Sequence, residues 1–245
     1  MKDGQRVLYC FGDSIMAQDK RAYAYESAER HFGQLGRICA GYPTLLEREF
    51  GLVAAKNGAA GGHGAAEQEE VIRAVDFRAA ELVLISVGVN DFSLGRPIGA
   101  LPAGGAPRHD DTFIGRYCAA LDHIFASNPL VRAVLMTPLY KDTTDRTKPG
   151  WRDSADRPVA GQMLADFAAA VREIGRFYGC PVADMYAESG LNRLNLKQLT
   201  FDGVHPTDRG YARTFPVLRE TVRRALQQTP RKGEAPALRD GAEQK

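Results

Sequence analysis

The chain has 245 residues, of which 44% are hydrophobic and 25% are charged, values that are ordinary for a globular protein. Its 32 basic and 30 acidic residues leave a formal charge of +2. That near balance argues against a nucleic-acid binder, which carries a clustered basic excess. No apolar run approaches the ~20 residues of a membrane span. The start of the chain has no charged segment followed by an apolar one, so we expect a cytoplasmic protein.

Short apolar runs alternate with helical patterns along the chain. Strands are predicted at residues 7–11, 52–55, 82–87, 131–136 and 181–183, because these runs are nearly continuous, as in strands covered on both faces. Helices with one apolar face are predicted at residues 112–126, 160–178 and 207–228. Pro216 lies inside the last pattern and predicts a kink or a break. The alternation indicates an α/β protein with a doubly wound parallel sheet, helices on both faces, and one domain over residues 1–228.

Some segments do not fit this scaffold. Residues 17–43, 92–111 and 140–158 are long loops, and in such folds loops after strands build the active site. Residues 229–245 are polar and are expected to form a disordered tail. The four cysteines show no spacing typical of metal ligands and have apolar neighbours, so we expect buried free thiols and no metal site.

The first candidate for chemistry is Ser14, in the sequence FGDSI at residues 11–15. A serine at this place lies where the first strand turns into a helix, with its hydroxyl above the sheet. Many serines in such positions only cap a helix, and the short motif alone does not decide between the two interpretations.

The second candidate is the pair Asp202 and His205, in the sequence FDGVHP at residues 201–206. An aspartate three residues before a histidine can fold back and hydrogen-bond the imidazole, as the acidic member of an acyl-transfer triad does. Histidine titrates near neutral pH and suits general-base work. The alternative is a turn in which Asp202 only caps a local N–H group.

Two further segments follow the second and third predicted strands. Asn90 can project its amide into the crevice above the sheet, although Asn90 and Asp91 could equally be turn residues. The glycine-rich residues 57–64 let backbone N–H groups approach a ligand closely. This loop lacks the Lys-Ser/Thr pair of a P-loop and the glycine spacing of a dinucleotide fingerprint, which disfavours a phosphate-binding role.

Together the four blocks resemble the SGNH (GDSL) hydrolase family. Its four marker residues map onto Ser14, a glycine of the 57–64 loop, Asn90 and His205, in the family's order over residues 11–206. The resemblance implies a three-layer α/β/α sandwich on a flavodoxin-like, doubly wound parallel sheet of five strands. It also implies a serine ester hydrolase that works through an acyl-enzyme, without metal or organic cofactor.

The same resemblance implies a role for each marker residue. Ser14 is the expected nucleophile, His205 the general base, and Asp202 the residue that orients the imidazole.

The expected oxyanion hole consists of the backbone N–H groups of Ser14 and Gly62 and the side-chain amide of Asn90. Gly62 is selected because the family glycine usually lies five residues after the Asn of its block, and Gly61 is the second choice.

The family acts on lipid esters, lysophospholipids, thioesters and acetylated sugars. The long loops carry many polar, aromatic and charged residues, chiefly at 17–43 and 140–158, whereas a long acyl chain needs an apolar trough. We therefore expect a short acyl group, such as O-acetyl, on a polar or carbohydrate alcohol. Trp151 and His63 are candidate substrate-binding residues, although Trp151 could equally pack within its loop and His63 could be a solvated loop residue.

Other functions stay open at this point. A lysophospholipase or acyl thioesterase is the main alternative, and an acyltransferase would differ only in the acceptor that resolves the acyl-enzyme. A non-catalytic, flavodoxin-like binding module is the alternative of another class. The expected partner is a small-molecule ester, without nucleic acid or membrane span, and the chain could form a homo-oligomer.

Overall fold

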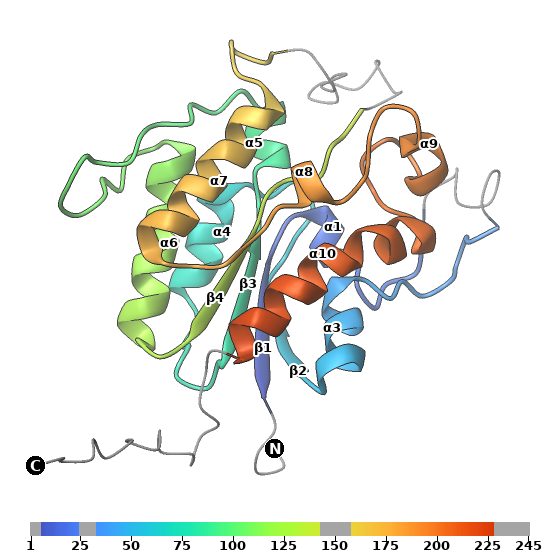
Figure 1. Ribbon diagram of the computed structural model, residues 1–245, viewed down its shortest axis with the longest axis horizontal. Coiled ribbons are helices and arrows are strands. Elements are labelled where there is room, and N and C mark those ends of the chain that lie inside the picture. The colour runs from blue at the N-terminus through green and yellow to red at the C-terminus, as the bar shows by residue number, and fades with distance from the viewer. Residues whose placement is uncertain (1–5, 25–32, 143–157, 228–245) are drawn as a thin grey trace, which may run out of the picture.

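The computed structural model of the chain describes residues 6–24, 33–142 and 158–227. Within them, five parallel strands form one sheet in the order β2-β1-β3-β4-β5, with helices on both faces (Figure 1). The strands are Val7–Gly12 (β1), Val53–Asn57 (β2), Leu82–Ser86 (β3), Arg132–Met136 (β4) and Val182–Ala183 (β5). This topology confirms the predicted flavodoxin-like, doubly wound sheet. The predicted tail at 229–245 lies outside the described residues.

The helices in the described part of the chain differ in length and in how well their patterns predict them. They are α1 (Ser14–Ala17), α3 (Tyr42–Phe50), α4 (Ala65–Arg73), α5 (Val89–Ser93), α6 (Phe113–Ser127), α7 (Leu164–Tyr178), α8 (Met185–Glu188), α9 (Leu196–Leu199) and α10 (Asp208–Gln227). Helix α6 matches its prediction, and Thr112 caps it by accepting the N–H group of Gly115 at 3.0 Å. Helix α7 begins later than predicted because Ala160 and Gly161 have φ values of 49° and 78°, which a helix does not allow.

Pro216 does not break the last helix, so of the expected kink or break the break is absent. Helix α10 runs without interruption from Asp208 to Gln227, with Pro216 inside it. A proline removes the hydrogen bond to the carbonyl group four residues earlier, here that of Ala212. Both residues lie on the exposed side of the helix, where water can bind the freed carbonyl group. The apolar face of α10 supplies the packing that keeps the helix continuous.

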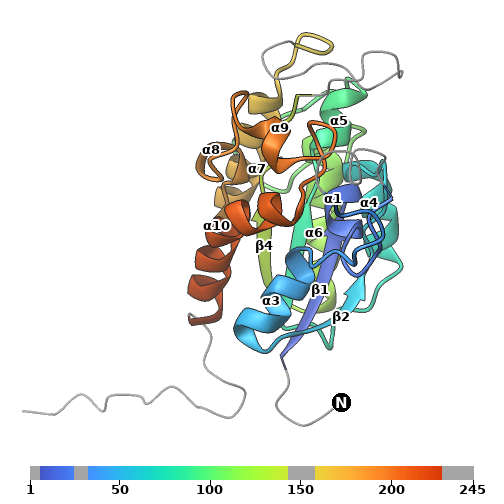
Figure 2. The ribbon, with the colours of Figure 1, turned by 90° about the vertical axis from the view of Figure 1, so that its right-hand side faces the viewer.

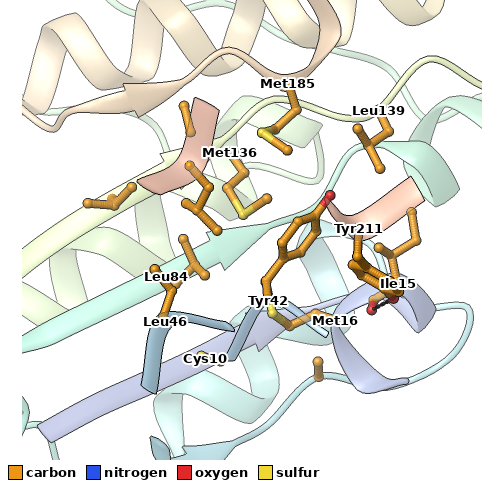
Figure 3. Close-up of a cluster of buried hydrophobic side chains, with 14 of the residues drawn as sticks. Cys10, Ile15, Met16, Tyr42, Leu46, Leu84, Met136, Leu139, Met185 and Tyr211 are labelled. Carbon is orange, nitrogen blue, oxygen red and sulfur yellow. Dashed lines mark hydrogen bonds between the residues drawn. The ribbon is translucent and has the colours of Figure 1, made fainter. Parts of the chain in front are cut away.

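Alternate side chains of the buried strands point into two hydrophobic clusters, one on each face of the sheet. The first cluster holds Leu8 and Cys10 of β1 with α3 and α10, and the second holds Phe11 with α4, α6 and α7. Figure 2 shows α3 and α10 together on one side of the sheet. Figure 3 shows part of the first cluster, where Tyr42 of α3 and Tyr211 of α10 lie above Cys10.

The described residues also give the state of the cysteines and the character of the helices. All four cysteines are buried and free, as predicted. Burial raises the pKa of the Cys10 and Cys180 thiols, which makes them poor nucleophiles. None of the helices that the structure describes combines the length and the apolar character needed to cross a membrane.

The strand order places a switch point between β1 and β3. The chain leaves β1 for β2 on one side and later returns to β3 on the other side. In open α/β sheets, ligands bind at the carboxyl ends of the strands that flank such a point. Ser14 follows β1 by two residues, and Asn90 follows β3 by four residues. The topology therefore brings two of the predicted site residues to the same crevice.

Candidate active site

The turn from β1 into α1 places Ser14 at the first position of a short helix. Asp13 is the residue that caps α1, since its Oδ1 accepts the N–H group of Ile15 at 2.9 Å. The capping role considered for Ser14 is therefore wrong, and its hydroxyl is available for another partner. Gly12 is required because a Cβ atom there would lie 2.6 Å from the Ser86 carbonyl oxygen.

Asp13 is 2% exposed and braces the turn, as its cap indicates. Burial raises the pKa of Asp13 to about 6, although the Ile15 N–H group and the charge of His205 act in the opposite direction. The negative charge of this carboxylate is therefore poorly solvated by water.

The loop before α10 presents Asp202 to His205. Asp202 Oδ2 lies 2.6 Å from His205 Nδ1, while Oδ1 accepts the N–H groups of Val204 at 3.0 Å and His205 at 2.8 Å. Gly203 adopts a φ of 84° in this turn, which favours glycine. Burial acts to raise the pKa of Asp202, but the hydrogen bond and charge of His205 outweigh it, so the pKa is lowered. Asp202 is therefore more than a local cap.

The imidazole of His205 reaches across the sheet edge to Ser14. Its Nε2 lies 2.8 Å from Ser14 Oγ, although 191 positions separate the two residues. The hydroxyl group of Tyr211 donates to the Ile15 carbonyl group at 2.7 Å and ties α10 to α1. Asp202, His205 and Ser14 form a continuous line from carboxylate to imidazole to hydroxyl group, which we call the relay. His205 is 7% exposed. In this arrangement the histidine can take a proton from the hydroxyl while the carboxylate stabilises the resulting imidazolium.

The glycine-rich loop after β2 lies against the Ser14 turn. The side chain of Asn57 donates to the Met16 carbonyl group at 3.2 Å, and Ala60 N–H donates to the Gly12 carbonyl group at 3.1 Å. A Cβ atom on Gly61 would lie 4.0 Å from Ser14 Cβ. Gly62 has a φ of 80°, so this position favours glycine even where there is space for a side chain.

Helix α5 holds the end of that loop through two neighbouring side chains. Asn90 Nδ2 donates to the His63 carbonyl group at 2.9 Å, and the carboxylate of Asp91 accepts the Ala65 N–H group at 2.9 Å and 3.2 Å. A Cβ atom on Gly64 would lie 2.5 Å from Asp91 Oδ1. Asn90 and Asp91 are thus not merely turn residues: together they form what we call the α5 clamp.

Asp91 is fully buried, and burial raises its pKa despite the Ala65 N–H group and the charge of Arg96. Arg96 joins Asp91 to Glu67, whose own pKa the Arg96 hydrogen bond lowers to about 2. Glu67 in turn accepts the Gly64 N–H group at 2.8 Å. This charged network connects α5 to the start of α4 and was not expected from the sequence.

His63 is half-buried and held in one tautomer. Gln68 Nε2 lies 3.0 Å from His63 Nδ1 and 3.3 Å from the Gly58 carbonyl oxygen. A carbonyl oxygen can only accept, so this Gln68 atom is the amide nitrogen, and His63 Nδ1 accepts from it. The neutral ring then carries its proton on Nε2, as a donor. The other candidate substrate residue, Trp151, lies outside the described residues.

The described part of the long loop at residues 17–43 packs against residues 201–206, the loop that holds Asp202 and His205, which we call the acid–base loop. Tyr23 is buried, its ring centroid lies 4.7 Å from that of Phe201, and its hydroxyl group donates to Asp208 at 2.9 Å.

No group of three or more histidine, cysteine or acidic side chains within residues 6–24, 33–142 and 158–227 is arranged to hold a metal ion. Sequence reasoning missed a buried lysine, Lys141, which it counted only among the loop charges.

Comparison with known proteins identifies the family of the chain. The sequence model of the GDSL-like lipase/acylhydrolase family matches residues 10–213. No curated protein matches the chain.

Solved structures share the fold. A possible lipase from Chitinophaga pinensis has a TM-score of 0.69 and 23% identity, over 91% of this chain and 99% of that one. The lipase/acylhydrolase from Enterococcus faecalis has a TM-score of 0.58 and 20% identity, over 89% and 97% of the two chains. A GDSL-like lipase from Bacteroides thetaiotaomicron has a TM-score of 0.58 and 18% identity, over 92% and 91%. The family match covers most of the chain, and the chain therefore belongs to the GDSL-like lipase/acylhydrolase family, as a hydrolase of ester bonds.

Proposed function

We propose that the protein is a serine esterase in which Ser14 is the nucleophile, His205 the general base and Asp202 the residue that orients the base. The observation that carries this proposal is the relay with distances of 2.6 Å and 2.8 Å from carboxylate to imidazole to hydroxyl. Such distances are within reach of direct proton transfer.

In the proposed mechanism, Ser14 Oγ attacks the ester carbonyl carbon while His205 Nε2 takes the hydroxyl proton. The tetrahedral intermediate collapses to an acyl-enzyme, and His205 returns the proton to the leaving alkoxide. Water then attacks the acyl-enzyme with His205 again as base, which releases the acid and restores the serine. No step needs a metal ion.

The oxyanion hole of this proposal consists of the backbone N–H groups of Ser14 and Gly62 and the Asn90 amide. One hydrogen of Asn90 Nδ2 is used for the His63 carbonyl group, and a primary amide has a second hydrogen to donate. The positive φ of Gly62 turns the backbone beside Ser14. Three donors placed before the reaction begins stabilise the negative charge that develops in the transition state.

For the substrate, we propose a short acyl group, such as acetyl, on a polar or carbohydrate alcohol. The support is the polar character of two side chains at the glycine-rich loop: His63, whose Nε2 is a donor, and Asn90, whose amide has a second hydrogen beyond the one that the His63 carbonyl group accepts. An apolar acyl trough would offer these donors no polar partner, whereas a polar alcohol does. We further propose that His63 donates to the alcohol part of the substrate.

The test is hydrolysis of p-nitrophenyl esters from acetyl to palmitoyl by the wild type and Ser14→Ala. We expect kcat/KM to fall steeply beyond butyryl, and Ser14→Ala to lower kcat by at least about 10³-fold. Rising activity with chain length would favour a lysophospholipase or acyl thioesterase. Product formation that increases with added alcohol would indicate an acyltransferase. Equal activity of both proteins would overturn the mechanism.

A further inference from the structure

Lys141 is a buried lysine that the relay does not use. It lies five residues after β4 and is 4% exposed. Its ammonium group donates to the hydroxyl group of Ser93, and Nζ lies 5.8 Å from the centroid of the Phe92 ring. Ser93 Oγ donates in turn to the Val89 carbonyl group at 2.9 Å. The lysine is thereby attached to α5, the helix that carries Asn90.

The segment around Lys141 also contacts the acid–base loop. The N–H group of Asp142 donates to the Gly203 carbonyl group at 2.9 Å, inside the turn between Asp202 and His205. The lysine therefore lies between the two halves of the proposed site, the helix with the oxyanion donor and the loop with the base.

Two carboxylates act on the charge of Lys141, one from the turn between β1 and α1 and one from the loop that holds His205. Burial lowers the pKa of Lys141 to about 8, and the carboxylates of Asp13 and Asp202 act to raise it. An apolar side chain of similar length would fill this space without removing an ammonium group from water. The presence of a charge is thus explained by the groups it faces: the two carboxylates, the Ser93 hydroxyl group and the Phe92 ring.

We propose that Lys141 is a positioning residue of the active site, whose ammonium group fixes α5 beside the 202–205 loop and balances the negative charge of Asp13 and Asp202. The inference rests on the proposed esterase function and adds a residue to it. Its charge also favours the negative oxyanion that develops beside α5.

A pH dependence follows from this assignment. Below about pH 8 Lys141 carries its positive charge and the site is intact. Above that pH the ammonium group loses a proton, and α5 loses the charged partner that holds it beside the 202–205 loop. The wild-type kcat should therefore fall on the alkaline side. Without the positive charge, the protonated form of the general base is favoured, so the acid limb of the profile should move to higher pH.

The experiment compares kcat and KM between pH 5.5 and 9.5 for the wild type, Lys141→Met, Lys141→Arg and Ser93→Ala. Lys197→Met is the matched control, because Lys197 is exposed on α9. We expect Lys141→Met to lower kcat by ~10-fold, with KM changed by less than about threefold, and to shift the acid limb up by about half a pH unit. Lys141→Arg should retain activity and lose the alkaline fall, because arginine keeps its charge.

A second readout does not depend on turnover. The NMR chemical shifts of the His205 ring protons at pH 7 should differ between Lys141→Met and the wild type, and should agree between Lys197→Met and the wild type, because Lys141 places its charge close to the relay. If the wild type hydrolyses no ester but this shift is present, the esterase proposal fails and the electrostatic role of Lys141 stands.

Two outcomes would overturn the inference. One is Ser14-dependent hydrolysis in which Lys141→Met and the wild type have the same kcat, the same pH profile of kcat and the same NMR signals of the His205 ring. The other is an alkaline fall that persists unchanged in Lys141→Arg. If circular dichroism shows that Lys141→Met does not fold, the inference is tested by the alkaline fall in kcat of the wild type and by Ser93→Ala. That variant should lower kcat by about threefold and still show the alkaline fall.

Discussion

The two halves of the site are built in different ways. In the relay, three side chains contact one another in a line, and two of them lie in one loop. In the α5 clamp, the side chains of Asn90 and Asp91 bind backbone groups of residues 63–65, and Arg96 is a side-chain partner of Asp91. In the proposed mechanism the relay carries out proton transfer, whereas the clamp holds the backbone of the loop that contains Gly62. A backbone N–H group cannot be reoriented by a side-chain rotation, so its position depends on the groups that hold the loop.

This difference gives each half its own response to mutation. Loss of a relay residue removes a chemical step, so it should affect turnover far more than folding. Loss of a clamp residue misplaces donors and also leaves buried polar groups without partners, so it should affect both.

The largest expected effect concerns the orientation of the base. Asp202→Asn keeps the shape of the side chain but presents an amide to His205 Nδ1, which favours the wrong tautomer. We expect kcat to fall by ~10³- to 10⁴-fold, measured with p-nitrophenyl acetate. Asp76→Asn is the matched control, since Asp76 is exposed and pairs with the neighbouring Arg78. A loss below tenfold in Asp202→Asn would show that His205 is oriented by other groups.

The next effect concerns the oxyanion donor. Asn90→Ala should lower kcat by ~10²- to 10³-fold and change KM little, because the donor acts mainly in the transition state. Its loss also leaves the His63 carbonyl group without the Asn90 hydrogen bond, so the melting temperature should fall by a few degrees. Wild-type kcat in this variant would remove Asn90 from the oxyanion hole.

A smaller effect tests the clamp from the side of the loop. In Gly64→Ala the new Cβ atom would lie 2.5 Å from the buried Asp91 carboxylate, so the loop must move. We expect a loss of about 1–3 kcal/mol in unfolding free energy and ~10-fold in kcat, from denaturant unfolding and kinetics. Gly104→Ala is the control, because a Cβ atom there meets nothing within 4 Å. Equal behaviour of the two variants would contradict a rigid clamp.

The smallest effect concerns the pH dependence of stability. Burial raises the pKa of Asp13 to about 6, above its value of about 3.9 in an unfolded chain. The folded chain therefore binds an extra proton between these values, and stability falls as pH rises through that window. Asp13→Asn keeps a capping oxygen and should raise the melting temperature at pH 7.5 by a few degrees. A gain of the same size at pH 4 would contradict this origin.

The relay was predictable because its signals are local. Ser14 follows an apolar strand, and Asp202 lies three residues before His205, so short motifs point to each residue. The clamp was not predictable in the same way. Asp91 was seen only as a turn residue, because its partner Ala65 lies 26 positions away and contributes a backbone group, which no motif marks. Lys141 was missed for a similar reason, since only the fold buries it.

The scaffold shows the same division. Helix α6 and the strands follow from apolar periodicity, whereas the late start of α7 depends on the backbone at Ala160 and Gly161. The continuity of α10 through Pro216 depends on packing that the local rule for proline does not include. The choice between Gly61 and Gly62 as oxyanion donor stays a prediction.

The long sequence separation within the relay has a consequence for how the protein is made. Ser14 and its base are 191 positions apart, and a ribosome adds roughly 5–20 residues each second. The proposed nucleophile therefore leaves the ribosome roughly 10–40 s before the proposed general base. If the two residues act as proposed, a nascent chain carries an inert serine during that interval. Hydrolysis would then begin only when the loop before α10 reaches the Ser14 turn, so that completion of the fold also completes the active site.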